Sequence, residues 1–114
     1  MDGLKLVHLF HILIVGSLFL YVGINRENTN KVLLSVLYYL GFIIIMYHFY
    51  KAYSYLQLNK GIWVNLIHIL LVGPLLVYIG YNGEKTSRKY FEMLLMLGFA
   101  SIGYHSYYLF PYHL

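Results

Sequence analysis

The sequence predicts an all-α integral membrane protein, a four-transmembrane-helix bundle built from a tandem repeat of two helical hairpins. Composition is the first indication, because 61% of the residues are hydrophobic and 11% are charged, against about 45–50% and about 25% in soluble domains. The mean hydropathy is +0.66. A soluble domain of 114 residues has too little interior to bury that much apolar surface, so lipid is the expected solvent.

Four apolar segments are the second indication, and they define the expected helices. Each has about 20 residues, which at about 1.5 Å per residue crosses a hydrocarbon core about 30 Å thick. We expect helices because, in lipid, every backbone polar group must be hydrogen-bonded within its own segment. The segments cover residues 5–24, 32–52, 61–81 and 89–110.

Short polar connectors separate the segments. They read NRENTNK at 25–31, SYLQLNKG at 54–61 and NGEKTSRK at 82–89. No small-residue cleavage motif follows the first apolar segment, so we expect a retained span and no signal peptide. In the Asn-x-Glu-x-Thr pattern that begins at Asn25 and again at Asn82, we expect the Asn and Thr side chains to cap the following helix.

A repeat of 57 residues is the third indication. The segment HILIVGSLFLYVGINRENT, residues 11–29, aligns with HILLVGPLLVYIGYNGEKT, residues 68–86. Over residues 4–57 and 61–114, 22 of the 54 aligned pairs are identical. We therefore interpret the chain as a tandem duplication, and two residues 57 positions apart are called a matched pair below.

The repeat predicts how the helices are organised. Residues 1–57 would form the first transmembrane hairpin and residues 58–114 the second, together one structural domain. Because each repeat holds two spans, both repeats have the same orientation, with a pseudo-two-fold axis along the membrane normal. Small residues allow close helix packing in membranes, and the matched glycines expected to do so are Gly16, Gly23, Gly41, Gly73, Gly80 and Gly98.

The distribution of Lys and Arg predicts the orientation in the membrane. The first and third connectors hold five of these residues, and the opposite ends of the segments hold three, which are Lys5, Lys51 and Lys60. The positive-inside rule then places connectors 1 and 3 in the cytoplasm and both termini outside. The expected partner is the lipid bilayer, and the small interior of four helices leaves homo-oligomerisation open.

Several classes of function are excluded or disfavoured. The chain has no cysteine, which excludes disulfides, thiolate metal sites and thiol nucleophiles. No run of Lys or Arg is long enough to predict nucleic-acid binding. The sequence contains no pattern typical of a nucleophilic triad, a phosphate-binding loop or a pair of catalytic carboxylates, so we do not expect an enzyme.

Four histidines are the candidate metal- or ligand-binding residues. They form two matched pairs inside apolar segments, His11 with His68 and His48 with His105. The first pair lies about two turns after the start of its helices and the second about one turn before the end, so all four are expected at a similar depth near one surface. Residues retained between the repeats form stripes along the helices, and we expect the four imidazoles to face inward as one cluster in one leaflet.

Other polar side chains are expected to support this cluster. They would hydrogen-bond to the imidazoles or extend the polar stripes toward the cytoplasmic end. The supporting residues are Tyr47, Tyr104, His8 and Asn65, and the residues at the inner end are Asn25 and Asn82. No carboxylate accompanies the histidines, so the tyrosines and backbone carbonyls would have to orient the rings.

Three functions remain open from the sequence. Ionisable residues inside membrane bundles tend to be functional, and the histidine and tyrosine cluster would bind a transition-metal ion, a proton or a small ligand for permeation or transport. The first alternative is a bis-histidine haem protein for electron transfer. The second alternative is a structural or assembly protein whose histidines join the helices by hydrogen bonds.

Overall fold

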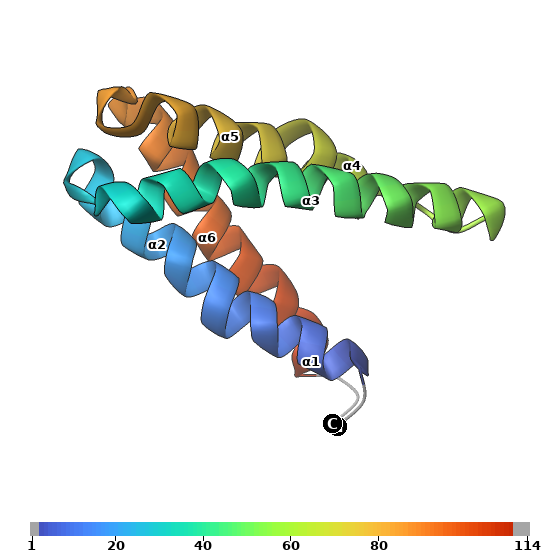
Figure 1. Ribbon diagram of the computed structural model, residues 1–114. Coiled ribbons are helices and arrows are strands. Elements are labelled where there is room, and N and C mark those ends of the chain that lie inside the picture. Colours follow the sequence, from blue (N-terminus) through green and yellow to red (C-terminus); the bar gives the residue numbers. More distant parts are fainter. Residues whose placement is uncertain (1–2, 111–114) are drawn as a thin grey trace. The chain divides into compact units, whose positions relative to one another are not determined.

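The computed structural model describes residues 3–110, and all regular elements in that range are helical (Figure 1). They form four long helices that the short connectors separate. The first comprises α1 (Gly3–Phe10), the π-helical η1 (His11–Val15) and α2 (Gly16–Asn25), followed by the 3₁₀ turn η2 (Arg26–Asn28). The second is α3 (Lys31–Gln57). The third comprises α4 (Trp63–Ile67), the π-helical η3 (His68–Val72) and α5 (Gly73–Asn82), followed by the 3₁₀ turn η4 (Gly83–Lys85). The fourth is α6 (Arg88–Leu109).

Three of the four helices in the described range are long and apolar enough to cross a membrane. They are Gly3–Asn28, Lys31–Gln57 and Trp63–Lys85. The fourth expected span, 89–110, forms α6, which has 22 residues. Its first turns carry charged side chains and its last turns are rich in Tyr, His and Ser, so its mean hydropathy is lower than that of the other helices.

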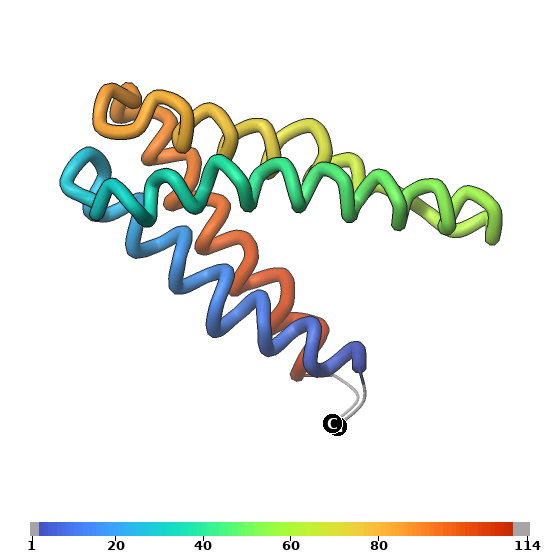
Figure 2. Tube along the Cα trace, in the orientation of Figure 1, coloured from blue at the N-terminus to red at the C-terminus, as the bar shows by residue number. Residues whose placement is uncertain are grey.

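The helices form two compact units. The terminal unit consists of Met1–Arg26 and Ser87–Leu114, and the central unit consists of Glu27–Thr86. In the terminal unit α2 and η1 pack on α6, and in the central unit α5 and η3 pack on α3. Figure 2 shows the two partners of each unit running side by side. Each unit therefore takes one helix from residues 1–57 and one from residues 58–114, and so cuts across the expected hairpins.

Glycines set the closest approach of the two helices in the terminal unit. A Cβ atom added to Gly23 would lie 2.9 Å from the Cα atom of Leu95, and one added to Gly16 would lie 2.5 Å from the side chain of Ile102. Because Gly23 and Leu95 meet backbone to backbone, this contact allows no larger residue on the first helix. The close packing predicted from these glycines is confirmed.

The central unit repeats these contacts at the matched positions. A Cβ atom added to Gly80 would collide with the backbone of Tyr38, and one added to Gly73 would collide with the side chain of Ile45. Each of these residues is 57 positions from its counterpart in the terminal unit. The two units thus have the same antiparallel register.

The second connector is shorter than predicted. Residues 54–57 continue α3, and the helix ends in a turn where Asn59 has φ 57°. The Lys60 N–H donates to the carbonyl of Tyr55, 2.9 Å away, and the Asn59 N–H donates to that of Leu56, 3.2 Å away. This double hydrogen bond is a Schellman motif with Asn in the left-handed position. The polar residues before Asn59 do not end the helix because none of them blocks helical backbone geometry.

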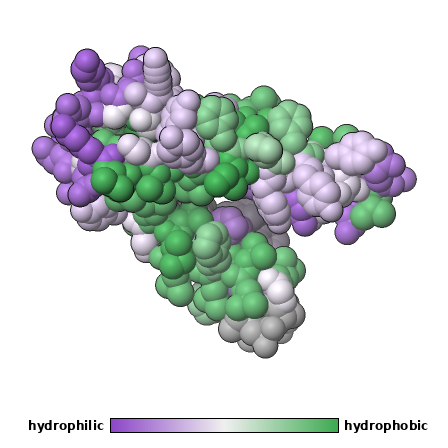
Figure 3. Space-filling model, viewed as in Figure 1, coloured by the Kyte–Doolittle hydropathy of each residue, from purple (hydrophilic) through white to green (hydrophobic). Residues whose placement is uncertain are grey.

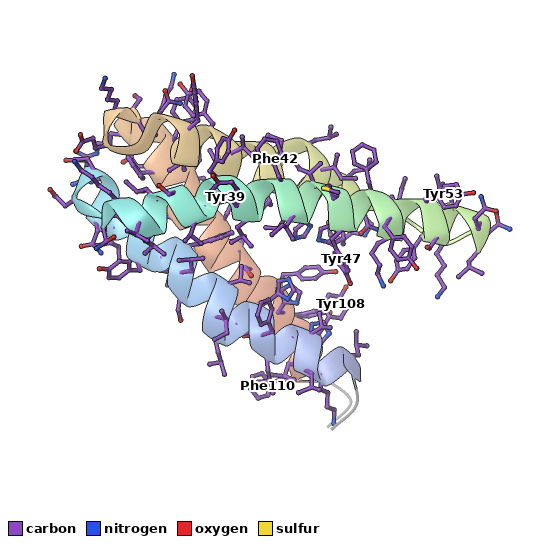
Figure 4. All side chains as sticks on the ribbon, in the orientation of Figure 1. Tyr39, Phe42, Tyr47, Tyr53, Tyr108 and Phe110 are labelled. Carbon is purple, nitrogen blue, oxygen red and sulfur yellow. The ribbon has the colours of Figure 1, made fainter. Side chains whose placement is uncertain are left out.

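Apolar side chains cover much of the surface of every helix. Large exposed examples are Leu13 at 61%, Ile43 at 61%, Leu70 at 72% and Met96 at 67%. In the central unit hydrophobic residues occupy the middle of the helices and hydrophilic residues lie toward the connectors (Figure 3). Aromatic side chains are also exposed, including Tyr39, Tyr53 and Phe110, each 66% exposed (Figure 4).

Candidate functional site

Two π-helical segments begin at histidines that form a matched pair. In η1 the N–H of Gly16 bonds to the carbonyl of His11, and in η3 the N–H of Gly73 bonds to that of His68. Both hydrogen bonds span five residues where an α-helix spans four. Short π-helical turns are rare and frequently occur at functional sites, so the histidines that start them are the first residues to consider.

The π-helical turns also alter the polar stripes. One extra residue in a turn rotates the part of the helix before it by about 100° relative to the part after it. His11, Leu18 and Asn25, at spacings of seven, therefore do not stay on one straight face as expected. Sequence periodicity missed the turns, although the shared HIL-[Ile/Leu]-Val-Gly pattern of residues 11–16 and 68–73 is a signal that could have indicated them.

Three imidazoles meet in the terminal unit. The Nδ1 atoms of His8 and His105 lie 2.8 Å apart. The ring of His105 stacks on that of His11, with centroids 4.2 Å apart and planes inclined by 20°. The Nδ1–H of His11 donates to the carbonyl of Val7, 2.8 Å away. The ring of His8 in turn lies 6.1 Å from that of Tyr108, with the two planes within 15°. His8 is buried, with 8% of its surface exposed.

The central unit has the same arrangement with one change. The rings of His48 and His68 stack with centroids 4.0 Å apart and planes inclined by 17°. The Nδ1–H of His68 donates to the carbonyl of Val64, 2.8 Å away. The partner of His48 is an amide, because its Nδ1 lies 2.8 Å from Oδ1 of Asn65. Asn65 is 5% exposed.

The structure thus gathers the predicted residues into two clusters, one in each unit. We call His8, His11 and His105 the terminal cluster, and His48, His68 and Asn65 the central cluster. The four imidazoles that were expected to form one cluster instead form two stacked pairs, one within each unit. His8 and Asn65 are hydrogen-bonding partners as expected, and backbone carbonyls orient the two histidines that begin the π-helical turns.

The other supporting residues have different contacts. The ring of Tyr47 meets that of His48 edge-on at 5.2 Å, and the ring of Tyr104 meets that of His105 edge-on at 5.1 Å. Each tyrosine is next to its histidine in the chain, so this contact follows from their adjacency. Both therefore contribute aromatic surface beside the clusters.

Asn25 and Asn82 act on the helices that precede them. The amide of Asn25 donates to the carbonyl of Tyr21 at 2.7 Å, and that of Asn82 donates to the carbonyl of Tyr78 at 2.8 Å. The prediction that they cap the following helix was wrong, because the helix-end carbonyls are closer to their side chains. The cap of α3 is Asn30, whose Oδ1 accepts a first-turn N–H at 2.7 Å.

The carboxylates of the described residues are separated from the two histidine clusters. The carboxylates of the described residues are Glu27, Glu84 and Glu92, all in or next to the first and third connectors. Two of them form exposed ion pairs, Glu84 with Lys31 at 3.8 Å and Glu92 with Arg88 at 3.6 Å. Since Glu92 and His105 are 13 residues apart on α6, about 20 Å of helix separates them. The imidazole hydrogen bonds described above therefore go to neutral partners.

The geometry of the stacks bears on metal and haem binding. A metal ion held by two imidazoles lies in the plane of both rings, along their nitrogen lone pairs. Nearly parallel stacked rings have planes that do not meet near the nitrogens, so neither pair forms a chelate in this arrangement. Centroids at 4.0 and 4.2 Å also leave no room for an iron and a porphyrin between the rings. Among residues 3–110, no group of three or more ligating side chains could hold a metal ion.

The chain matches no protein-family model, no curated protein and no solved structure.

Proposed function

We propose that the chain is a small four-span integral membrane protein that binds protons at two imidazole sites, one in each compact unit. The observation that carries the proposal is the recurrence, at matched positions in both units, of two stacked imidazoles whose Nδ1 atoms are hydrogen-bonded. Imidazole is the side chain whose ordinary pKa, about 6.5, allows its charge to change near neutral pH.

The exposed apolar surface supports insertion of all four helices. Exposed aliphatic side chains on each helix, such as Leu13, Ile43, Leu70 and Met96, are stable in contact with lipid. On this proposal α6 is the fourth span, with its charged first turn at the headgroups. The distribution of basic residues favours cytoplasmic first and third connectors and external termini.

The hydrogen bonds favour a proton over a metal ion as the ligand. Carbonyls accept from Nδ1–H of His11 and His68, so the neutral rings carry their lone pair on Nε2. A proton requires only one such lone pair, whereas a chelated metal requires two lone pairs that converge on one point. Stacked rings provide single lone pairs, but they do not provide two lone pairs that converge on one point.

The matched contacts support the tandem duplication. Gly16 with Ile102 and Gly73 with Ile45 are the same contact in the two units, and the hydrogen bonds of His11 and His68 to carbonyls four residues earlier are also the same. Because each unit combines helices from both repeats, the duplicated chain is equivalent to two copies of a helical hairpin that exchange partners.

The proposal is tested by imidazole ¹⁵N NMR of histidine-labelled protein in lipid nanodiscs between pH 8 and pH 5. We expect the cluster imidazoles to take up protons within this pH range. Single His11→Gln and His68→Gln variants assign the signals of the two π-helical turns. Imidazoles that stay neutral down to pH 5 would contradict the proposal.

An absorption spectrum and an elemental analysis of the same sample test the alternatives. We expect a colourless protein without a stoichiometric metal. A haem absorption band, abolished by His→Ala at one imidazole pair, would replace the proposal by the electron-transfer alternative. A metal present at one ion per unit would show that the stacks open to form a chelate.

A structural role is the second candidate, and the interhelical hydrogen bonds favour it. His8 with His105 and His48 with Asn65 each join two helices of one unit. Substitution would then lower stability, and the imidazoles would not change their charge between pH 8 and pH 5. The same titration therefore separates the two functions.

A further inference from the structure

The two clusters differ at a single matched position, and this position decides how each responds to protons. Residue 8 is a histidine and its match at 65 is an asparagine, and both are buried. The stacked pair and the carbonyl hydrogen bond are otherwise the same in both units. The terminal unit thus joins its helices through an imidazole–imidazole hydrogen bond, and the central unit does so through an imidazole–amide hydrogen bond.

We propose that the hydrogen bond between His8 and His105 is a proton-operated latch of the terminal unit. It holds α1 on α6 while at least one of the two rings is neutral, and it is released when both rings are protonated. The central unit has no such latch. This inference rests on the proposed function, namely that the imidazoles take up protons.

The chemistry of two facing Nδ1 atoms leads to this conclusion for either tautomer. At a separation of 2.8 Å, one Nδ1 carries the hydrogen and donates it, and the other accepts with its lone pair. A first proton, taken up at Nε2 of the donor ring, preserves this bond and makes it charge-assisted. A second proton occupies the accepting Nδ1. His8 and His105 then present two N–H donors and two positive charges to each other, so the bond is lost.

The central unit keeps its hydrogen bond in both charge states. Oδ1 of Asn65 accepts from Nδ1–H of His48 whether the ring of His48 is neutral or cationic. An amide has no charge change in this pH range, and a carbonyl oxygen accepts better from a cation. Acidification therefore strengthens this contact, whereas it breaks the corresponding contact of the terminal unit.

Among residues 3–110, no negatively charged group around the latch offsets the two added charges. Three elements carry the titratable groups around it, and no carboxylate of the described residues lies at this end of the terminal unit. Tyrosine hydroxyls, with an ordinary pKa of about 10, stay neutral between pH 8 and pH 5. The groups are Lys5 on α1, His11 on η1, and Tyr104, Tyr107 and Tyr108 on α6.

Spin labels measure the separation of the helices directly, because the chain has no cysteine. One labelled variant carries Phe10→Cys and Gly103→Cys in the terminal unit, and its matched control carries Ile67→Cys and Met46→Cys in the central unit. Phe10, Ile67 and Met46 are exposed, and an added Cβ at Gly103 meets no atom within 4 Å. Distances are measured by pulsed electron resonance on the full chain in nanodiscs at pH 8 and pH 5.

We expect the distance in the terminal unit to lengthen and its distribution to broaden at pH 5 more than in the central unit. There, protonation of His48 and His68 adds repulsion between the stacked rings but leaves the hydrogen bond to Asn65 in place. Exchanging the matched residues should exchange this behaviour. With His8→Asn the pH response of the terminal unit should fall to that of the central unit, and with Asn65→His the response of the central unit should rise to that of the terminal unit. Circular dichroism at pH 8 checks that both variants are folded, and His8→Gln replaces His8→Asn if that variant is not.

Other outcomes overturn the inference in distinguishable ways. If imidazole ¹⁵N spectra show no protonation down to pH 5, the proposed function fails and the latch fails with it. If His8 and His105 both become protonated and the distance in the terminal unit does not change, only the latch fails. A pH response of the terminal unit that is undiminished after His8→Asn, or that is equal in the two units of the unmodified chain, also overturns the latch.

Discussion

The terminal and central units have the same helix register, but some of their matched positions carry different side chains. The stacked imidazoles and the glycine contacts are the same in both, whereas His8 corresponds to Asn65 and Arg26 corresponds to Gly83. The retained features are those where two backbones or two rings meet at fixed distance. The varied features are those where a second residue can make an equivalent hydrogen bond or adopt the same backbone conformation.

The backbone contacts of Gly23 and Gly80 should be the most sensitive part of this shared register. We expect Gly23→Ala and Gly80→Ala each to lower the free energy of unfolding by about 3 kcal/mol, because the added methyl meets backbone that cannot move aside. The measurement is unfolding in mixed detergent micelles at pH 8. Gly103→Ala is the matched control, since nothing lies within 4 Å of its added Cβ, and it should not destabilise the chain.

The buried partners at positions 8 and 65 should have the next largest effect. Asn65→Leu leaves Nδ1–H of His48 without its amide acceptor, and we expect a loss of about 2 kcal/mol at pH 8. His8→Leu should cost a similar amount, since it removes the partner of His105. His8→Asn and Asn65→His keep a partner and should cost much less. A stability for Asn65→Leu equal to that of the unmodified chain would show that the hydrogen bond contributes nothing.

The smallest expected effect concerns the turns that end α2 and α5. Arg26 has φ 52° and Gly83 has φ 57°, a conformation that only glycine adopts without strain. We expect Arg26→Gly to raise the free energy of unfolding by about 1 kcal/mol and Gly83→Ala to lower it by about as much. Thermal unfolding of the two variants measures these changes. Changes in the free energy of unfolding that have the same sign in both variants would contradict the prediction.

The helices and their glycine contacts could be predicted from the sequence because their signals are strong. Apolar length defines a helix in lipid, and Gly16, Gly23, Gly73 and Gly80 indicate where a second helix comes close. The partner of each helix could not be predicted, because hydropathy is the same for every arrangement of four apolar helices. The 57-residue sequence pattern predicted hairpins within residues 1–57 and 58–114, whereas each compact unit pairs one helix from each of these two ranges.

The histidine clusters could be predicted in part. Their positions within the apolar segments indicated His11, His48, His68 and His105 as candidates. These residues do stack in pairs, His11 with His105 and His48 with His68. Their division into two stacks follows from the helix pairing, which the sequence did not reveal. Each π-helical turn contains a single extra residue. A hydrophobic pattern with a period of 3.6 residues is read over several turns, so one extra residue is not detected in it.

The pairing of the first helix with the fourth has a consequence for synthesis on the ribosome. The central unit uses two consecutive helices, so its partners can meet as soon as residues 27–86 have left the exit tunnel. The terminal unit joins His8 to a residue 97 positions later, so its first helix has no partner helix until nearly the whole chain has been translated. A nascent chain that stops before α6 therefore retains a complete central unit and a first helix whose buried His8 lacks its partner His105.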